Sequence, residues 1–248
     1  MNPKVSLLEQ RHAVRSFSEE AIPQNIVNSL KAEVTMTNTH EQGMKFQLFF
    51  NDPDPLKGFS RAYGMFMNPA NFLAAVIDTA TPDAYERAGY FAEKFAIKAV
   101  SLGLGTCFVS GTYDRSKVRA QLRAGEKLIF IVIFGFPMEK KRPVASLMSM
   151  LTHHKTMDPE DFFDPASMAL REEREFPELS DGLAGVACAP SAMNKRPVRV
   201  FLDDNGRLCA KVPENSPAML IDLGIAKFNY NYATDTLCEW GNGAPLES

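Results

Sequence analysis

An ungapped internal repeat is the strongest constraint on what this chain can fold into. The segment Thr37–Asp52 (TNTHEQGMKFQLFFND) aligns with Ala189–Asp204 (APSAMNKRPVRVFLDD). Each copy is predicted to run from a polar loop into an apolar strand that ends in an acidic turn. Only the second loop, Pro190–Asn194, is rich in small hydrogen-bonding residues. The repeat therefore predicts two similar halves that keep different chemistry and together build one asymmetric site.

The composition indicates a globular protein with a substantial core. Of the 248 residues, 45% are hydrophobic, and 18 of them are Phe, which is enough for a buried core. The formal net charge of -3 argues against a nucleic-acid-binding protein, since such proteins are usually basic. Length alone is compatible with one large domain or two small ones.

Targeting and cysteine patterns favour a cytoplasmic protein without a membrane partner. The longest apolar run, Leu128–Phe134, is too short to span a bilayer and predicts a buried strand. The start of the chain lacks the apolar segment of a signal peptide. The four cysteines show neither a CxxC pair nor metal-ligand spacing, so we expect reduced thiols.

The first half of the chain predicts helices and strands in alternation. Ser18–Pro23 combines a hydroxyl cap, early acids and an early proline, which is typical of a helix start. Phe91, Phe95 and Ala99 recur at helical spacing, and Gly103 stands where that helix would end. We expect helices at 2–10, 18–33 and 82–102, and strands at 45–50, 71–78 and 128–136.

The second half repeats this order after a connector without clear periodicity. We expect a helix at 179–188, strands at 198–202 and 207–212, and a helix at 218–233. The prediction is an α+β fold in which two similar α/β halves, residues 1–142 and 161–248, form an intrachain pseudo-dimer joined by a connector at 143–160. A chance likeness of two α+β halves is the alternative, which the aligned segment and the shared element order disfavour.

Two arginines stand four residues apart in the basic segment Arg11–Arg15 (RHAVR). If their guanidinium groups meet on one side of the backbone, they can bind a phosphate through paired hydrogen bonds. Taken alone, the pattern is also that of a solvated basic turn, and this interpretation stays open.

The loop Ala189–Asn194 combines a stiffening proline with short donors and acceptors at a helix-to-strand junction. Such a loop can hydrogen-bond the edge of a planar heterocycle. An ordinary turn is the alternative.

Glycines in the segment Gly103–Gly111 permit close approach of the backbone to a flat ligand. Lys140 and Arg142, which follow the apolar run, add cations for a phosphate. The GLG sequence follows a predicted helix rather than a strand, so we reject a dinucleotide-binding βαβ fingerprint.

Together these segments resemble the FMN-dependent nitroreductase family. Its R-[RH]-x-x-[RK]-x-[FY] motif matches Arg11–Phe17, and its A-P-S-x-x-N-x-Q-P-W loop is similar to Ala189–Val198. Its G-L-G-T-C-W-x-x-G segment is similar to Gly103–Gly111, and its G-[YF]-P…K-x-R segment to Gly135–Arg142. The resemblance implies a nitroreductase-like fold.

Two positions of the loop motif depart from the family pattern. Arg196 replaces Gln and Val198 replaces Trp. Arg196 either alters the substrate pocket or points to solvent, and we favour solvent.

In ordinary members of this family the Pro-Ser-x-x-Asn loop lies early in the chain, whereas here it lies in the second half. That displacement resembles the duplicated, single-chain branch, in which one chain stands for the usual homodimer. In the homodimer each flavin takes phosphate ligands from one subunit and the loop from the other. The resemblance thus implies one FMN per chain, held by Arg11, His12, Ala13, Arg15, Val109, Ser110, Gly111, Lys140 and Arg142 of the first half and Pro190, Ser191, Ala192 and Asn194 of the second.

A second, complementary site is expected to be degenerate. Its loop would be Asn38–Gln42, and its phosphate motif would fall at Met168–Arg174, where acidic residues would repel a phosphate. His12 is a phosphate or ribityl contact by resemblance, with a plain surface histidine as the alternative.

The activity implied is that of an NAD(P)H:acceptor oxidoreductase, which passes a hydride through FMN to a small electron-poor acceptor such as a nitroaromatic or quinone. A flavin carries the hydride itself, so no catalytic side chain is required. A non-catalytic flavin-binding protein and a structural pseudo-dimer without flavin are the alternatives. The oligomeric state stays open, because a monomeric pseudo-dimer suffices for the site.

A metal site is not expected. His153 and His154 lie among methionines, but no carboxylate or thiol stands at ligand spacing. A loop is the better interpretation of this segment.

Overall fold

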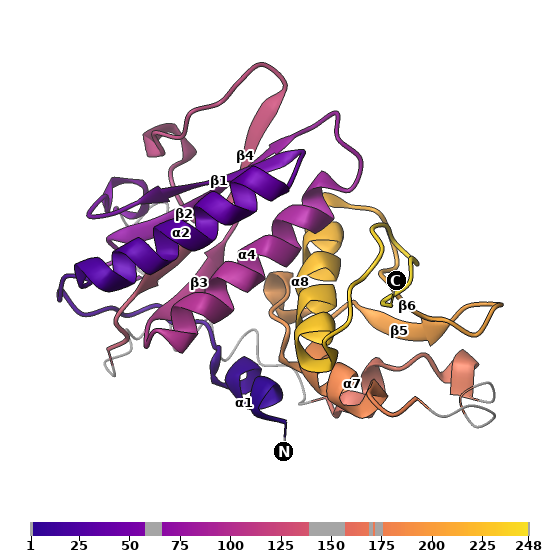
Figure 1. Ribbon diagram of the computed structural model, residues 1–248. Helices are drawn as coiled ribbons and strands as arrows, with labels where there is room; N and C mark the ends of the chain where they lie inside the picture. Colours follow the sequence, from indigo (N-terminus) through magenta and orange to yellow (C-terminus); the bar gives the residue numbers. More distant parts are fainter. Residues whose placement is uncertain (1, 58–65, 139–156, 169–170, 172–175, 248) are drawn as a thin grey trace. The chain divides into compact units, whose positions relative to one another are not determined.

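The computed structural model describes residues 2–57, 66–138, 157–168, 171 and 176–247. The chain forms two compact units (Figure 1). Unit 1 comprises residues 1–10, 85–94 and 154–248, and unit 2 comprises residues 11–84 and 95–153. The long helix α4 (Ala84–Ser101) contributes to both.

A four-stranded antiparallel sheet forms the centre of unit 2. In spatial order its strands are β1 (Met44–Phe49), β2 (Asn71–Asp78), β4 (Glu126–Gly135) and β3 (Gly105–Val109). The two central strands, β2 and β4, are buried over almost their whole length. Burial on both faces explains why their sequences are continuous apolar runs rather than alternating ones.

Different segments cover the two faces of the sheet. On one face Phe134 of β4 contacts Phe95 of α4, with ring centroids 5.4 Å apart. The neighbouring side chain on the strand, Ile133, points to the other face and joins a buried cluster with Val14 and Phe17. The basic segment that follows α1 (Pro3–Gln10) therefore belongs to this second face.

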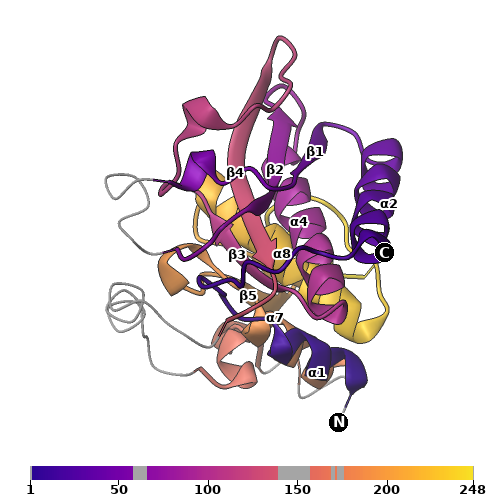
Figure 2. The same ribbon diagram turned by 90° about the vertical axis from the view of Figure 1, so that its left-hand side faces the viewer.

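Helix α2 (Gln24–His40) lies along β1, and the turned view shows it on the side of the sheet occupied by α4 (Figure 2). The predicted helix at 18–33 was wrong at both ends. Pro23 is the N-cap, and Ser18 instead donates its N–H to the carbonyl of Phe136 at 2.9 Å. The helix continues past residue 33 because Val34 and Thr37 extend its buried face.

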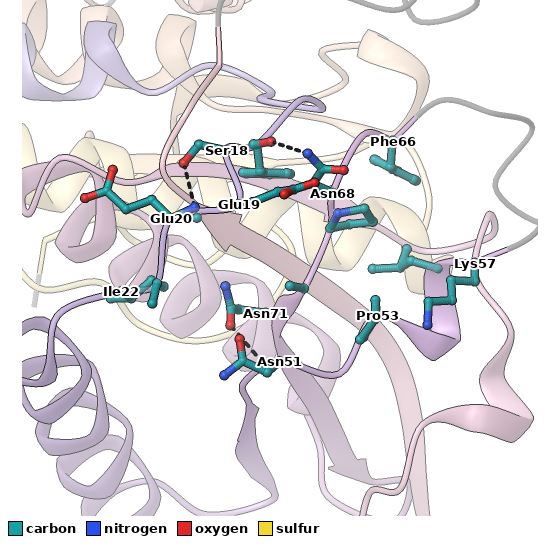
Figure 3. Close-up of a pocket in the computed structure, with 16 residues that line it drawn as sticks. Ser18, Glu19, Glu20, Ile22, Asn51, Pro53, Lys57, Phe66, Asn68 and Asn71 are labelled. Atoms are coloured by element: carbon teal, nitrogen blue, oxygen red, sulfur yellow. Dashed lines mark hydrogen bonds between the residues drawn. The ribbon is translucent and has the colours of Figure 1, made fainter.

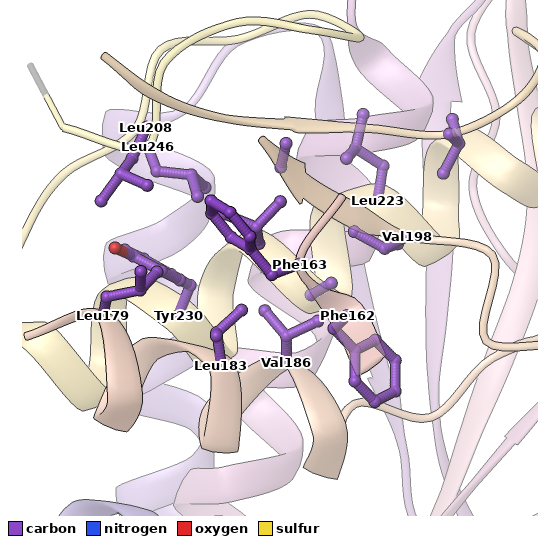
Figure 4. Close-up of a cluster of buried hydrophobic side chains, with 14 of the residues drawn as sticks. Phe162, Phe163, Leu179, Leu183, Val186, Val198, Leu208, Leu223, Tyr230 and Leu246 are labelled. Carbon is purple, nitrogen blue, oxygen red and sulfur yellow. The ribbon is translucent and has the colours of Figure 1, made fainter. Parts of the chain in front are cut away.

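Unit 1 is built around helix α8 (Pro217–Thr234), which is buried along most of its length. Helix α7 (Leu179–Cys188) packs against it, and β5 (Arg199–Leu202) and β6 (Leu208–Lys211) form a two-stranded antiparallel ribbon. Leu223 and Tyr230 of α8 meet Leu183 of α7 and Phe163 in one apolar cluster (Figure 4). Short 3₁₀ turns complete the described elements at Asp54–Leu56, Arg115–Lys117, Pro159–Phe162, Pro165–Ser167 and Ala192–Asn194.

Two glycines permit a close crossing of α4 and α8 within unit 1. A Cβ added to Gly89 would overlap the main-chain carbonyl of Ile221, and a Cβ added to Gly224 would overlap that of Glu86. Each glycine lies against the residue three positions before the other glycine. Such reciprocity is the relation that a two-fold axis imposes on an interface.

The α+β class and most predicted elements are confirmed. The strands at 45–50, 71–78, 128–136, 198–202 and 207–212 and the helices at 2–10, 82–102, 179–188 and 218–233 agree with the observed elements within about two residues. Strand β3 was not predicted, because its five residues begin at a glycine and lack an apolar run.

The two copies of the repeat both form a strand, but their polar segments differ in structure. The aligned apolar segments form β1 and β5, and each is followed by an antiparallel strand and a long helix. The first polar loop was predicted wrongly, since Thr37–His40 is the last turn of α2. Internal duplication and the halves at 1–142 and 161–248 stay predictions. Within the described residues, no helix is long and apolar enough to cross a bilayer.

Candidate functional site

The basic segment Arg11–Phe17 is fixed by its backbone beside the sheet of unit 2. Val14 donates its N–H to the carbonyl of Thr106 in β3 at 2.9 Å. The carbonyl of Arg15 accepts the N–H of Met67, also at 2.9 Å. Both bonds use main-chain atoms, so they fix the path of the backbone beside β3.

Arg11 and Arg15 bring positive charge to the same place. Val14 and Ser16 are buried, Ala13 is exposed, and both arginines are half-buried, as expected where alternate residues of an extended segment face opposite ways. Burial raises the pKa of the Cys107 thiol in β3, and the charges of Arg15 and Arg11 both oppose that rise. Both arginines therefore contribute positive charge to the surroundings of Cys107. His12 is exposed and falls out of phase with the arginines.

The end of β3 supplies a second part of the predicted site. Val109 is 3% exposed and belongs to the core, so its main chain rather than its side chain is available to a ligand. A Cβ added to Gly111 would meet no atom within 4 Å, whereas one added to Gly105 would overlap Val14. The space beside Gly111 is thus open, as the approach of a flat ligand requires.

The loop Pro190–Asn194 belongs to unit 1, between α7 and β5. Ser191 Oγ accepts the N–H of Arg196 at 2.8 Å, and Asn194 Oδ1 accepts from Arg196 Nε at 3.3 Å. Arg196 is half-buried, and its side chain contacts the loop through Asn194. Met193 is 64% exposed at the tip.

Asp222 of α8 was not predicted as part of the site. Both of its carboxylate oxygens accept the N–H of Ala192, at 3.0 and 3.1 Å. Desolvation raises the pKa of Asp222 to about 7, against the opposing effects of the Ala192 bond and the Lys195 charge. The available signal was an acid inside the apolar run Met219–Ile225 of a predicted helix.

The remaining predicted residues divide into those that the structure describes and those that it does not. Lys140, Arg142, His153 and His154 lie outside the described residues. In the expected degenerate motif Met168–Arg174, the described Arg171 binds Glu160 through both terminal nitrogens, at 2.5 and 3.3 Å. That guanidinium is therefore already engaged by a carboxylate.

A cavity of about 530 Å³ lies elsewhere in unit 2. Asn51, Asn68 and Asn71 line it together with Ser18, Glu19, Glu20 and Lys57 (Figure 3). Its volume is in the range of small-molecule sites. Two carboxylates against one ammonium make it a poor match for a phosphate dianion. Phe17 and Gly135 of the motifs line it, but none of the predicted cofactor-binding residues does. Sequence reasoning missed this cavity, because its asparagines form no contiguous motif: Asn51 and Asn68 precede β2, and Asn71 begins it.

The comparison with protein families finds a match over nearly the whole chain. A family described as "Putative TM nitroreductase" matches residues 5–234. A solved "putative nitroreductase" from Thermotoga maritima is 18% identical, with a TM-score of 0.57 over 94% of this chain and 83% of that one; this identity shows the fold alone. A structure from Desulfovibrio desulfuricans in complex with FMN is 19% identical, with a TM-score of 0.44 over 59% of this chain and 95% of that one.

An "FMN-dependent nitroreductase" from Clostridium difficile is 16% identical, with a TM-score of 0.44 over 62% of this chain and 99% of that one. A search of curated proteins finds no match. Because the family match spans residues 5–234, the chain belongs to the nitroreductase family described as "Putative TM nitroreductase", and the family predicted from its motifs is confirmed.

Proposed function

We propose that this protein is an FMN-dependent oxidoreductase that transfers a hydride from NAD(P)H to a small electron-poor acceptor such as a nitroaromatic or quinone. Membership of a nitroreductase family supports an oxidoreductase. The observation that supports the cofactor is that the backbone of the segment carrying Arg11 and Arg15 is bound to β3, with both arginines half-buried there. When bound, the flavin supplies the hydride and electron chemistry, so the protein has to bind, orient and shield it.

The residues of unit 2 are assigned to the phosphate and the adjoining chain of the cofactor. Arg11 and Arg15 bind the phosphate as paired cations, with the small, exposed Ala13 between them. His12 adds a polar contact. The main chain of Val109–Gly111 borders the ring, where the absence of a side chain at Gly111 leaves room. Lys140 and Arg142 complete the cation set in this proposal.

The residues of unit 1 are assigned to the polar edge of the flavin ring. Pro190 stiffens the loop, and Ser191, Ala192 and Asn194 provide its hydrogen-bonding groups. One FMN per chain follows, because the two sets of residues each occur once.

Internal duplication supports this assignment of one site to two sets of residues. The reciprocal packing of Gly89 and Gly224 and the shared order of helix, strand, strand and helix both favour two related halves. In the first half, the position of the ring-binding loop is occupied by the last turn of α2. In the second, Arg171 of the phosphate motif is bound by Glu160. Both support a degenerate second site.

The phosphate assignment is tested by FMN binding to the purified protein. Arg11→Ala with Arg15→Ala is expected to weaken FMN binding about 100-fold or more, because each charge-assisted hydrogen bond contributes roughly 1.5–3 kcal/mol. Lys127→Ala is the control, since Lys127 is an exposed cation of the same unit. Binding followed by quenching of flavin fluorescence measures both. Unchanged affinity in the arginine variant would contradict the assignment.

Absorption of visible light separates the proposal from its alternatives. A yellow protein that takes up one FMN per chain supports a flavoprotein, and loss of its colour with NAD(P)H supports an enzyme. Uptake of FMN without reduction would favour a non-catalytic flavin-binding protein. A colourless protein that takes up no FMN would favour a structural pseudo-dimer.

A further inference from the structure

The loop assigned to the flavin ring has a strained backbone. Met193, Asn194 and Arg196 have φ values of 54°, 54° and 49°. Side chains other than glycine adopt this left-handed region at a cost in free energy. Three such residues within four positions persist only if surrounding contacts determine the conformation. Strain of this kind gathers at ligand-binding segments.

Hydrogen bonds inside the loop account for part of its order. Asn194 donates its N–H to the carbonyl of Ser191 at 2.9 Å, and Lys195 donates to the carbonyl of Ala192 at 3.2 Å. These bonds close turns within the segment, and they do not attach it to the rest of unit 1.

Asp222 attaches the loop to the buried helix α8. Its two oxygens accept the N–H of Ala192, in the middle of the loop. Asp222 is 5% exposed and stands next to Leu223, which is fully buried. Placing a carboxyl group among apolar side chains costs free energy. The hydrogen bond to Ala192 offsets part of that cost.

Asp222 acts through the loop rather than on a ligand. A cavity of about 10 Å³ lies between Pro190, Ser191 and Asp222, which is space for about one water molecule. A flavin ring does not fit there. We propose that Asp222 is a positioning residue, which holds the loop Pro190–Asn194 in the conformation that binds the flavin ring. This inference rests on the proposed function.

Ionisation of Asp222 strengthens the hydrogen bond that it accepts from Ala192. A carboxylate forms a shorter and stronger hydrogen bond with an N–H than a neutral carboxyl group does. The charged groups near Asp222 are Lys195 and Arg196, which directly follow the loop. The other elements around it present apolar residues, namely Phe162, Val186, Val198 and Ala226. FMN affinity is therefore expected to rise with pH across neutrality, by about fivefold.

The test compares Asp222→Asn and Asp222→Ala with wild type and with Asp204→Asn, a control at an exposed acid of the same unit. FMN affinity is measured by fluorescence quenching from pH 6 to pH 8. Asp222→Ala is expected to bind FMN about tenfold more weakly. Asp222→Asn keeps one acceptor and folds as a near-isostere, and it is expected to lose the pH dependence assigned to Asp222. The phosphate of FMN titrates in the same range, and this contribution is common to both proteins.

Wild-type affinity in Asp222→Ala, or an unchanged pH dependence in Asp222→Asn, would overturn the positioning role. Hydrogen exchange of the backbone amides at 191–194 in FMN-free protein gives a readout that does not depend on flavin. Faster exchange there in Asp222→Ala than in Asp204→Asn supports the role, and equal exchange overturns it. A wild-type protein that binds no FMN overturns the proposed function instead, and the exchange result still decides whether Asp222 holds the loop.

Discussion

Lys227 Nζ of α8 lies 2.6 Å from Glu86 Oε1 of α4, and neither side chain has any exposed surface. The ammonium also donates to the carbonyls of Glu239 and Gly241 at 2.9 Å. Glu86 Oε2 in turn accepts the N–H of Gly241 at 2.8 Å. The pair thus joins two helices of unit 1 to the segment that follows α8. Satisfied hydrogen bonds on both ions are what make a buried ion pair tolerable.

Breaking this pair is expected to destabilise the protein strongly. Lys227→Met leaves the Glu86 carboxylate buried without its partner, which costs about 3–5 kcal/mol of unfolding free energy. The double variant Lys227→Met with Glu86→Gln is expected to recover part of this loss, because no uncompensated charge remains. Lys4→Met is the surface control: it breaks the Lys4–Asp235 pair, whose acid is 83% exposed, at a cost of about 1 kcal/mol or less. Urea denaturation measures all three, and equal losses in the two single variants would contradict the account.

The crossing of α4 and α8 predicts matched effects at its two glycines. Gly89→Ala and Gly224→Ala each place a methyl group against the backbone of the facing helix. Each is expected to lose about 3 kcal/mol of stability, despite the gain of roughly 1 kcal/mol in helix propensity. Gly111→Ala, where the added Cβ meets no atom, should lose less than about 1 kcal/mol. Thermal unfolding that leaves both helical variants at wild-type stability would show that the helices do not cross as described.

Asp222 predicts a pH dependence of stability in the FMN-free protein. Burial raises its pKa from the usual 3.8 to about 7, so the folded state binds this proton more tightly than the unfolded state between those values. The unfolding free energy is therefore expected to fall as pH rises from about 4 to about 7, by roughly 4 kcal/mol at most. Asp222→Asn removes this contribution. Chemical denaturation at pH 5 and pH 8 measures the difference, and identical pH profiles for the two proteins would contradict it.

Three thiols are expected to be unreactive in the folded protein. Burial raises the pKa of Cys107 and Cys209 above the usual value, and that of Cys238 to about 11. Little thiolate is then present at pH 8, and the thiolate is the form that alkylates. Iodoacetamide treatment followed by mass spectrometry should modify these positions slowly in native protein and fully after unfolding. Rapid modification of native Cys107 would place it at the surface.

Local patterns in the sequence predicted the elements whose burial is continuous. Strand β2 was predicted with both ends correct, because its six consecutive apolar residues are bounded by the polar residues Asn71 and Asp78. Helix α7 was likewise predicted from Leu179 to Cys188. The start of α2 was missed. The backbone N–H of Ser18 donates to the carbonyl of Phe136, so Ser18 does not cap the helix. That contact joins residues more than a hundred positions apart.

The candidate site was predictable only where a motif is contiguous. Arg11, Arg15 and the loop at Pro190 stand out because the residues that matter are neighbours in the sequence. The bond between Asp222 and Ala192 spans 30 positions. Asp222 is the one acid of α8, but no local pattern indicates which backbone group it binds. The engagement of Arg196 by Ser191 and Asn194 depends on left-handed backbone that these residue types do not require.

The central claim is that the chain passes hydride equivalents through one bound FMN. The most direct measurement is an anaerobic titration of FMN-loaded protein with NADH or NADPH, followed by the visible absorption of the oxidised flavin. The account predicts complete loss of that absorption at one equivalent of reduced nicotinamide per chain, and its return when a quinone or nitroaromatic is added. Absorption that persists with both nicotinamides in excess would contradict it.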